Sequence, residues 1–242
     1  MKTKIMGHRG ARGLAPENTI EGMKLAWRLG VDMTETDIYL TKDNVLVLCH
    51  DDDISRTAGV PGKIIDMTFD ELRALDFGSS FNKYFAGAKI PTLKEALDII
   101  PEGKMMAVEV KDYRPELIPY LEEVLNECNA REKVRLISFS LDAVENCKKR
   151  MPDIDCYYLM YTFDKIDWEA KADIVKSKGI DGFCIEPFMF NDEAVKAFRD
   201  RGMVYNCGVT NEADLARKMR DYEPGWICTD RPDIVLEALE DK

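Results

Sequence analysis

The sequence has only two histidines in 242 residues and contains no long hydrophobic run. No segment approaches the roughly 18 consecutive apolar residues of a membrane span, and residues 1–8 lack the apolar stretch of an export signal. We therefore expect neither a stable membrane anchor nor export. Low-complexity tracts, repeats and Pro/Gly-rich linkers are also missing, so the composition is that of a globular protein rather than a disordered one.

The chain also lacks the cysteine spacing that builds disulfide frameworks or zinc sites. Its seven cysteines are an odd number, and none of them forms a CxxC pair. Several lie in apolar runs, as Cys184 does in 182–185, where a free cysteine is usually a small buried hydrophobe. This usage is typical of a reducing compartment, so we predict a cytoplasmic location.

Basic residues are fewer than acidic residues. The 34 Lys and Arg residues face 45 Asp and Glu residues, which gives a net charge of -11. Nucleic-acid binding depends on clustered basic side chains, so we expect no nucleic-acid partner. A small anionic ligand can still bind at a locally positive site made by a metal ion and a few cations. The sequence indicates no particular oligomeric state.

What the sequence does contain is a regular alternation of short apolar runs and amphipathic, helix-like segments. Residues 5–7 and 31–40 are the first two predicted strands, and residues 45–49 extend the second one through a turn. A segment from 51 to about 89 then interrupts the alternation as an insertion. The pattern resumes at residue 105 and continues to the end of the chain.

Eight strand–helix units can be counted along the chain. That number favours closure into a (β/α)8 TIM barrel over a doubly wound open sheet, which is the alternative. We predict one barrel domain over residues 1–242, with the insertion after the second strand at about 51–89. In such a barrel, functional side chains lie where the strands end.

Both histidines stand directly after a predicted strand. His8 follows the first strand and His50 follows residues 45–49, so both are expected at the same rim of the barrel. A single histidine is more often a structural side chain than a catalytic one. Two at equivalent positions favour proton transfer, because imidazole titrates near neutral pH.

Three carboxylates are predicted to gather near the histidines. Glu35 and Asp37 are two residues apart on the second strand, so both point to one face. Unpaired carboxylates are costly to bury, and a divalent cation relieves that cost; hard oxygen ligands suit Mg²⁺ or Ca²⁺. Glu109 at the end of the strand at 105–110 could complete the site. Without it, Glu35 and Asp37 would also fit an ordinary solvated pair at a strand end.

Two basic residues complete the candidate site. Three carboxylates around a dication leave a charge of -1, so Lys111 and Arg9 are the cations that we expect to attract a substrate phosphate. Taken alone, Glu109 and Lys111 would be read as a plain salt bridge.

An ordered set of short motifs resembles the glycerophosphodiester phosphodiesterase family over nearly the whole chain. The motifs are His8-Arg9-Gly10, Pro16-Glu17-Asn18-Thr19, Gly30-Val31-Asp32, Glu35-Thr36-Asp37, Leu40-Thr41-Lys42-Asp43, His50-Asp51, Ser55-Arg56-Thr57, Pro91-Thr92-Leu93-Lys94-Glu95, Glu109-Val110-Lys111 and Thr229-Asp230-Arg231-Pro232.

The resemblance implies an enzyme that hydrolyses a small-molecule glycerophosphodiester to glycerol 3-phosphate and an alcohol. It also implies a metal held by Glu35, Asp37 and Glu109, together with the insertion after the second strand. By this resemblance the two histidines would act as general acid and general base, and Arg9 and Lys111 would bind the phosphate.

The chain departs from the family pattern near the end of the seventh strand. Where the family usually carries Trp-Thr-Val-Asn, this chain has Cys207-Gly208-Val209-Thr210. Loss of the indole predicts a space at the barrel mouth beside Cys207 and tolerance for larger headgroups. Glu186, after the sixth strand, fits an exposed rim carboxylate better than a polar contact in that pocket.

Two other functions are compatible with the same residues. A lysophospholipase D or sphingomyelinase-D-like enzyme would need an apolar mouth; the insertion offers Phe77, Phe81, Tyr84 and Phe85, a pattern more typical of a local core. A non-catalytic phosphodiester-binding module is the second alternative, and the intact set of histidines and carboxylates counts against it.

Overall fold

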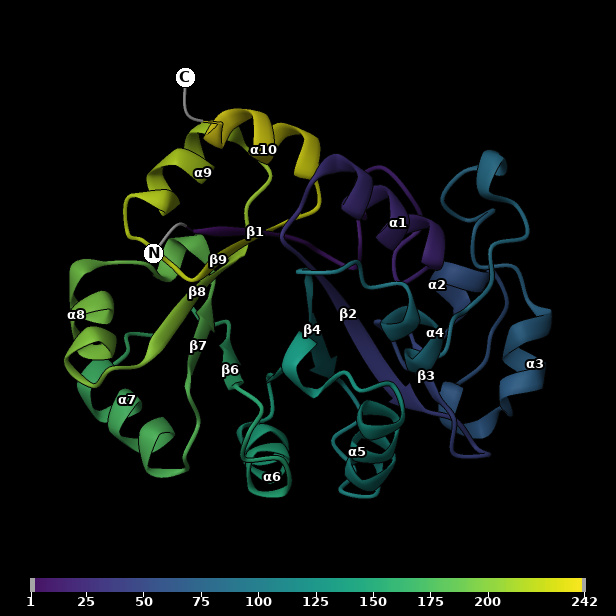
Figure 1. Cartoon of the computed structure of the whole chain (residues 1–242), viewed down its shortest axis with the longest axis horizontal. Helices are drawn as coiled ribbons and strands as arrows, with labels where there is room; N and C mark the ends of the chain where they lie inside the picture. The colour runs from purple at the N-terminus through teal and green to yellow at the C-terminus, as the bar shows by residue number, and fades with distance from the viewer. Residues whose placement is uncertain (1–2, 241–242) are drawn as a thin grey trace.

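The structure is a computed structural model that describes residues 3–240, so both ends of the predicted 1–242 domain lie outside the described residues. Eight parallel strands pair in the order β1-β9-β8-β7-β6-β5-β4-β2, and pairing of β1 with β2 closes them into a barrel (Figure 1). The predicted TIM barrel is confirmed, and the open sheet is excluded. The strands are β1 (Lys4–Gly7), β2 (Met33–Leu40), β4 (Met105–Val110), β5 (Val134–Ser138), β6 (Cys156–Met160), β7 (Gly182–Ile185), β8 (Val204–Val209) and β9 (Trp226–Thr229).

Helices surround the barrel, as Figure 1 shows. Those between barrel strands or after the last one are α1 (Ile20–Leu29), α4 (Leu93–Asp98), α5 (Leu117–Glu127), α6 (Leu141–Arg150), α7 (Trp168–Ser177), α8 (Asp192–Asp200), α9 (Ala213–Arg220) and α10 (Pro232–Leu239), with short 3-10 turns η3 (Arg131–Lys133) and η4 (Pro187–Met189). Local chemistry sets their ends: Thr19 Oγ1 accepts the Gly22 N–H at 3.1 Å to begin α1, and Gly30 ends it at φ 104°. Within residues 3–240, no helix combines the length and apolar character needed to cross a membrane.

The barrel interior is apolar in its middle layer and polar toward the C-terminal ends of the strands. Its buried lining is Met6, Met33, Ala107, Ile137, Tyr157, Cys184, Trp226 and Cys228. Because side chains alternate along a strand, the residue two positions after each inward residue points inward one layer higher. The next polar layer is formed by Glu35 on β2 and Glu109 on β4, and by His8, Glu186 and Asp230 directly after β1, β7 and β9. The fold therefore gathers polar groups where these strands end.

The second strand differs from its prediction. Residues 45–49 do not extend it; β3 (Leu46–Leu48) folds back antiparallel on β2, with Leu48 opposite Ile38. The turn between them passes through Asn44 at φ 64°, a left-handed conformation that Asn tolerates. This hairpin returns the chain to the rim, where the Cys49 N–H donates to the Asp37 carbonyl at 3.1 Å.

The insertion lies to the right in Figure 1 and has a small core of its own. It contains α2 (Ser55–Ala58), η1 (Ile64–Asp66), α3 (Phe69–Ala74) and η2 (Lys83–Phe85). Phe77 is buried in that core, Phe81 and Phe85 pack edge to face at 5.7 Å, and Tyr84 is exposed. Phe77 is thus part of a local core, as expected, whereas Phe81 and Tyr84 are exposed.

Candidate active site

The three predicted carboxylates meet at the rim of the barrel. Asp37 on β2 is the register partner of Glu109 on β4, and Glu35 lies two residues before Asp37. One oxygen from each lies within 4.8 Å of the others, and all three residues are buried. Glu35 Oε1 and Asp37 Oδ1 accept no hydrogen bond from the described residues.

The raised pKa values of two of these carboxyl groups show that it is unfavourable to bury them in the charged form. Burial raises the pKa of Glu35 well above its ordinary value, and the charges of Asp37 and Glu109 add to the rise. Burial also raises the pKa of Glu109 to about 8; repulsion by Asp37 adds to the rise, and Lys111 and Arg9 act against it. Three adjacent buried carboxylates, two of them with an oxygen that accepts no hydrogen bond from the described residues, fit a hard divalent cation. The cluster can therefore hold such an ion.

His8 is held by a carboxylate from the far end of the chain. Its Nδ1 lies 2.6 Å from Asp230 Oδ1, and its Nε2 lies 3.9 Å from Glu35 Oε2. Burial lowers the pKa of His8, although the hydrogen bond to Asp230 acts in the opposite direction. Burial would raise the pKa of Asp230, but the hydrogen bond and charge of His8, together with Asn211 and Arg12, lower that pKa to about 2. The result is a neutral imidazole whose Nδ1–H faces an ionised carboxylate.

His50 also has a carboxylate against its Nδ1. Its Nδ1 lies 2.6 Å from Asp51 Oδ1, and burial lowers its pKa despite the attraction of Asp37. The predicted rim position is correct, but its reason is different. His50 does not follow a barrel strand; the β2–β3 hairpin returns it to the level of Asp37.

Both predicted cations lie against the carboxylate cluster. The Arg9 N–H donates to Glu35 Oε2 at 2.9 Å, its Nε lies 3.3 Å from Asp37 Oδ2, and its backbone adopts a left-handed φ of 48°. Lys111 Nζ lies 2.7 Å from Glu109 Oε1 and 3.5 Å from Asp37 Oδ1. All seven residues predicted from the sequence are therefore assembled at one rim.

The structure adds supporting residues to which the sequence gave no role. Asn18 donates from Nδ2 to Asp37 Oδ2 at 2.8 Å, and its Oδ1 accepts from the Asp37 N–H, so it fixes that carboxylate. Glu17 accepts from Arg9 at 2.9 Å and from Arg56 at 2.8 Å. Burial would raise the pKa of Glu17, but the Arg56 hydrogen bonds and the charge of Arg9 hold it at about 2. Glu17 and Asn18 both lie in the Pro16–Thr19 motif, and that motif is the sequence feature that could have indicated them.

The prediction of a space beside Cys207 was wrong. Cys207 is fully buried in the core between the barrel and the helices, with Sγ 3.6 Å from Thr210 Oγ1. The alternation of β8 turns Gly208 inward instead, and the Glu186 carboxylate lies against it: a Cβ at position 208 would come within 2.6 Å of Glu186 Oε1. Glu186 is half-buried rather than an exposed rim residue.

This orientation changes the expected effect of an aromatic side chain at position 207. Cys207→Trp should force an indole into a packed core and lower the free energy of unfolding by about 3 kcal/mol. Urea denaturation measures the loss. A variant of wild-type stability that discriminates against large headgroups would instead return position 207 to the pocket.

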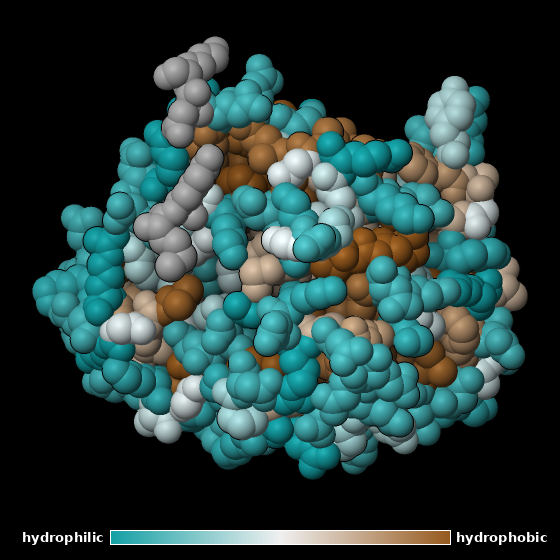
Figure 2. Space-filling view, viewed as in Figure 1, coloured by the Kyte–Doolittle hydropathy of each residue, from teal (hydrophilic) through white to brown (hydrophobic). Residues whose placement is uncertain are grey.

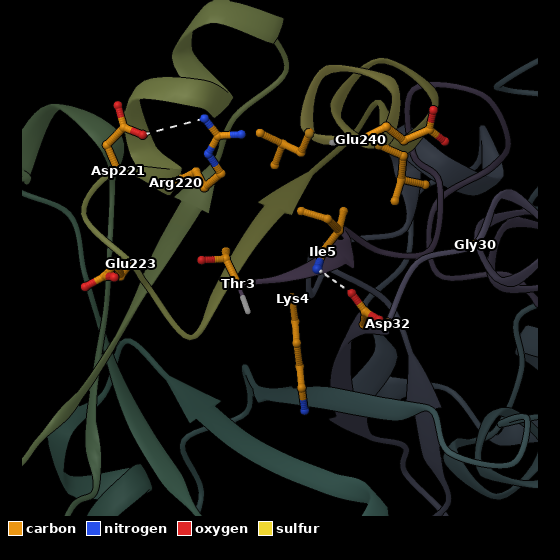
Figure 3. Close-up of a pocket in the computed structure, with 11 residues that line it drawn as sticks. Thr3, Lys4, Ile5, Gly30, Asp32, Arg220, Asp221, Glu223 and Glu240 are labelled. Carbon is orange, nitrogen blue, oxygen red and sulfur yellow. Dashed lines mark hydrogen bonds and ion pairs between the residues drawn. The ribbon is translucent and has the colours of Figure 1, made fainter. Parts of the chain in front are cut away.

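The opposite end of the barrel has a hollow of about 780 Å³, drawn in Figure 3. There Asp32 Oδ2 accepts the Ile5 N–H at 2.9 Å, and Arg220 pairs with Asp221. The face in Figure 2 is mostly hydrophilic, with hydrophobic residues gathered near α10. This hollow contains neither imidazole, and its Asp32 serves to join β1 to the start of β2. The candidate active site is therefore the rim where the strands end.

Comparison with known proteins gives consistent matches along the chain. The model of the "Glycerophosphoryl diester phosphodiesterase family" matches residues 8–234. A glycerophosphodiester phosphodiesterase of Caldanaerobacter subterraneus is 31% identical, over 99% of this chain and 98% of the relative. One from Bacillus altitudinis is 33% identical, over 99% of both. A phosphodiesterase structure from Oleispira antarctica, in complex with the product sn-glycerol-3-phosphate, is 27% identical, with a TM-score of 0.89 over 98% of this chain and 97% of that one.

Proposed function

This chain belongs to the glycerophosphoryl diester phosphodiesterase family, and we propose that it hydrolyses glycerophosphodiesters to glycerol 3-phosphate and an alcohol. The observation that carries the proposal is the pair of His–Asp dyads, His8–Asp230 and His50–Asp51, beside one carboxylate cluster. The full-length relatives and the product complex of the Oleispira antarctica protein support the same reaction.

The two imidazoles would divide the proton transfers. In each dyad the carboxylate faces Nδ1, which leaves Nε2 for the substrate. One Nε2 would remove a proton from the nucleophile, and the other would return one to the leaving alkoxide. Asp230 and Asp51 would stabilise the imidazolium that forms when a histidine takes up a proton.

The charged residues would bind and orient the phosphate. Arg9, which is buried, and Lys111, which is partly buried, supply two positive charges for its oxygens. Glu35, Asp37 and Glu109 would hold one divalent cation, Mg²⁺ or Ca²⁺, which would supply neutralisation of phosphate charge as the transition state develops. Burial beneath the rim strengthens all of these interactions relative to water.

The acid side of the pH profile tests the imidazole assignment. Burial lowers the pKa of both His8 and His50 below the ordinary 6.5. A general base works in its neutral form, so activity should be lost as pH falls through that lowered pKa. We expect the acid limb of kcat/KM to have its midpoint below pH 6.5, in assays with saturating metal. A midpoint above 6.5 would contradict a neutral buried imidazole as the base.

The function itself is tested with a panel of glycerophosphodiesters that differ in the alcohol. Glycerol 3-phosphate release is followed with a coupled dehydrogenase, with and without divalent cation. Release of glycerol 3-phosphate from at least one diester supports the proposal. Binding of the diesters without turnover would leave the non-catalytic module, and preference for a long-chain lysophospholipid would favour the lysophospholipase D alternative.

A further inference from the structure

A chain of charged side chains connects the loop after β1 to the insertion. Glu17 lies in that loop with its side chain only 10% exposed, and Arg56 lies on α2 of the insertion. Arg56 donates to both oxygens of Glu17 at 2.8 Å, one from Nη1 and one from Nη2. Two parallel bonds of this kind fix the plane of the guanidinium group as well as its position. The insertion is therefore held to the first loop of the barrel beside the active site.

The remaining donor of Arg56 reaches the His50 dyad. Arg56 Nε donates to Asp51 Oδ2 at 2.7 Å, and the other oxygen of that carboxylate lies 2.6 Å from His50 Nδ1. With both oxygens engaged, Asp51 resists rotation away from the imidazole. His50 lies after β3 in a segment without regular structure. Side-chain contacts, rather than strand geometry, therefore determine where its imidazole points.

Glu17 is suited to be the fixed end of this chain. Besides the two bonds from Arg56, it accepts from Arg9 at 2.9 Å, and Arg12 Nε lies 3.5 Å from its Oε2. The Arg56 hydrogen bonds and the charge of Arg9 hold its pKa at about 2 against the effect of burial, so it is ionised at neutral pH. A carboxylate with three guanidinium neighbours and little solvent contact has few other conformations to adopt.

The His8 dyad is held in a different way. Asp230 accepts from Asn211 Nδ2 at 3.0 Å, and the Asp230 N–H donates to Asn211 Oδ1 at 2.8 Å. Arg12 Nη1, which belongs to the group around the buried glutamate, lies 3.8 Å from Asp230 Oδ1, beyond hydrogen-bond range. The chain of hydrogen bonds therefore leads to His50, whereas the other dyad is reached only by a longer ion pair.

We propose that Glu17 is a positioning residue of the active site, which orients the His50 imidazole through Arg56 and Asp51. The inference rests on the proposed hydrolysis, in which His50 carries one of the two proton transfers. Proton transfer depends on the direction of the hydrogen bond, so an imidazole that rotates freely would react slowly although metal and phosphate remain bound. The insertion then takes part in the reaction, because it contributes Arg56.

Steady-state kinetics at saturating Mg²⁺ test the chain at Arg56. Arg56→Lys keeps the positive charge but cannot bond both carboxylate partners with a fixed fork, so kcat should fall about tenfold while KM changes less than about twofold. Arg131→Lys is the matched control, because Arg131 also pairs with two carboxylates, Glu122 and Asp153, and lies before β5 at the other end of the barrel. An unchanged kcat in Arg56→Lys, or an equal loss in both variants, overturns the proposal.

A double-mutant cycle tests whether Glu17 acts through Arg56. Glu17→Gln keeps the size and removes the charge, so it interrupts the same chain, and the double variant should have a kcat little lower than either single variant. Two independent effects would instead multiply to about a hundredfold loss and contradict the chain. Glu122→Gln is the control for the charge change, because Glu122 also lies between two arginines, Arg131 and Arg150.

Nuclear magnetic resonance tests the position of His50 without the reaction. The chain has only two histidines, so isotope labelling of the histidine nitrogens gives two imidazoles, which the His8→Ala and His50→Ala variants assign. The nitrogen shifts report which ring nitrogen carries the proton. In the Mg²⁺-loaded protein, Arg56→Lys and Glu17→Gln should each weaken the Nδ1–H preference of His50 and leave the His8 shifts at their wild-type values.

The resonance experiment also separates this inference from the proposed function. If no diester is hydrolysed but the His50 shifts change as expected, the positioning role is supported while the proposed function fails. If Glu17→Gln does not fold, Arg56→Lys decides alone, since the Arg56 side chain is 48% exposed and its replacement is expected to be tolerated. Unchanged His50 shifts in the folded variants overturn the positioning role even where hydrolysis is observed.

Discussion

Removal of divalent cations with EDTA should abolish phosphodiester hydrolysis, and Mg²⁺ or Ca²⁺ should restore it. The reason is the close approach of Glu35, Asp37 and Glu109, with oxygens within 4.8 Å and two raised pKa values. Without a dication, the buried carboxylates take up protons and the site loses the ion that neutralises phosphate charge. A bound dication contributes several kcal/mol to stabilising transition-state charge, so the loss should be on the order of 10³-fold or more.

Glu35→Gln refines this experiment because it preserves shape and removes one charge from the cluster. It should weaken metal binding, measured by calorimetry, and lower activity at limiting metal far more than at saturating metal. Glu132→Gln, an exposed carboxylate in η3 before β5, is the control. Full activity of Glu35→Gln after chelation would remove Glu35 from the metal site.

Much of this site was visible in the sequence because strands alternate with a period of two. Once Met33 is assigned to a barrel strand, Glu35 and Asp37 must share its inward face, and the same holds for Ala107 and Glu109. Neighbouring parallel strands end at one rim of the barrel. His8 and Lys111 are therefore brought to that rim beside the carboxylates.

The parts that could not be predicted depend on long-range pairing and exact register. Nothing local shows that residues 45–49 reverse direction rather than continue, because an apolar run has the same appearance in parallel and antiparallel strands. The inward residue of β8 was misplaced at Cys207, and this strand has an irregular register between Cys207 and Val209. The bond between His8 and Asp230 joins residues 222 positions apart, so only the closed barrel brings them together.

Replacing either His8 or His50 by Ala should lower kcat on the order of 10²-fold or more, because each imidazole carries one proton transfer. Asp230→Asn should give a smaller loss of about 10-fold to 100-fold, since it disturbs the orientation and tautomer of His8 without removing it. Metal affinity and thermal unfolding are measured on the same variants. A histidine variant that loses activity only through unfolding or loss of metal would assign that residue to structure.

The two imidazoles can then be distinguished by the leaving group. A glycerophosphodiester of p-nitrophenol releases a phenolate that needs no proton, so a variant lacking the general acid should keep most of its activity on this substrate. A variant lacking the base should lose activity on both p-nitrophenyl and alkyl diesters. We expect the His8→Ala and His50→Ala variants to separate in this way, because the two dyads lie on different elements, β1–β9 and the β2–β3 hairpin, yet share one carboxylate cluster. Equal losses on both substrates in both variants would contradict a division of acid and base work between them.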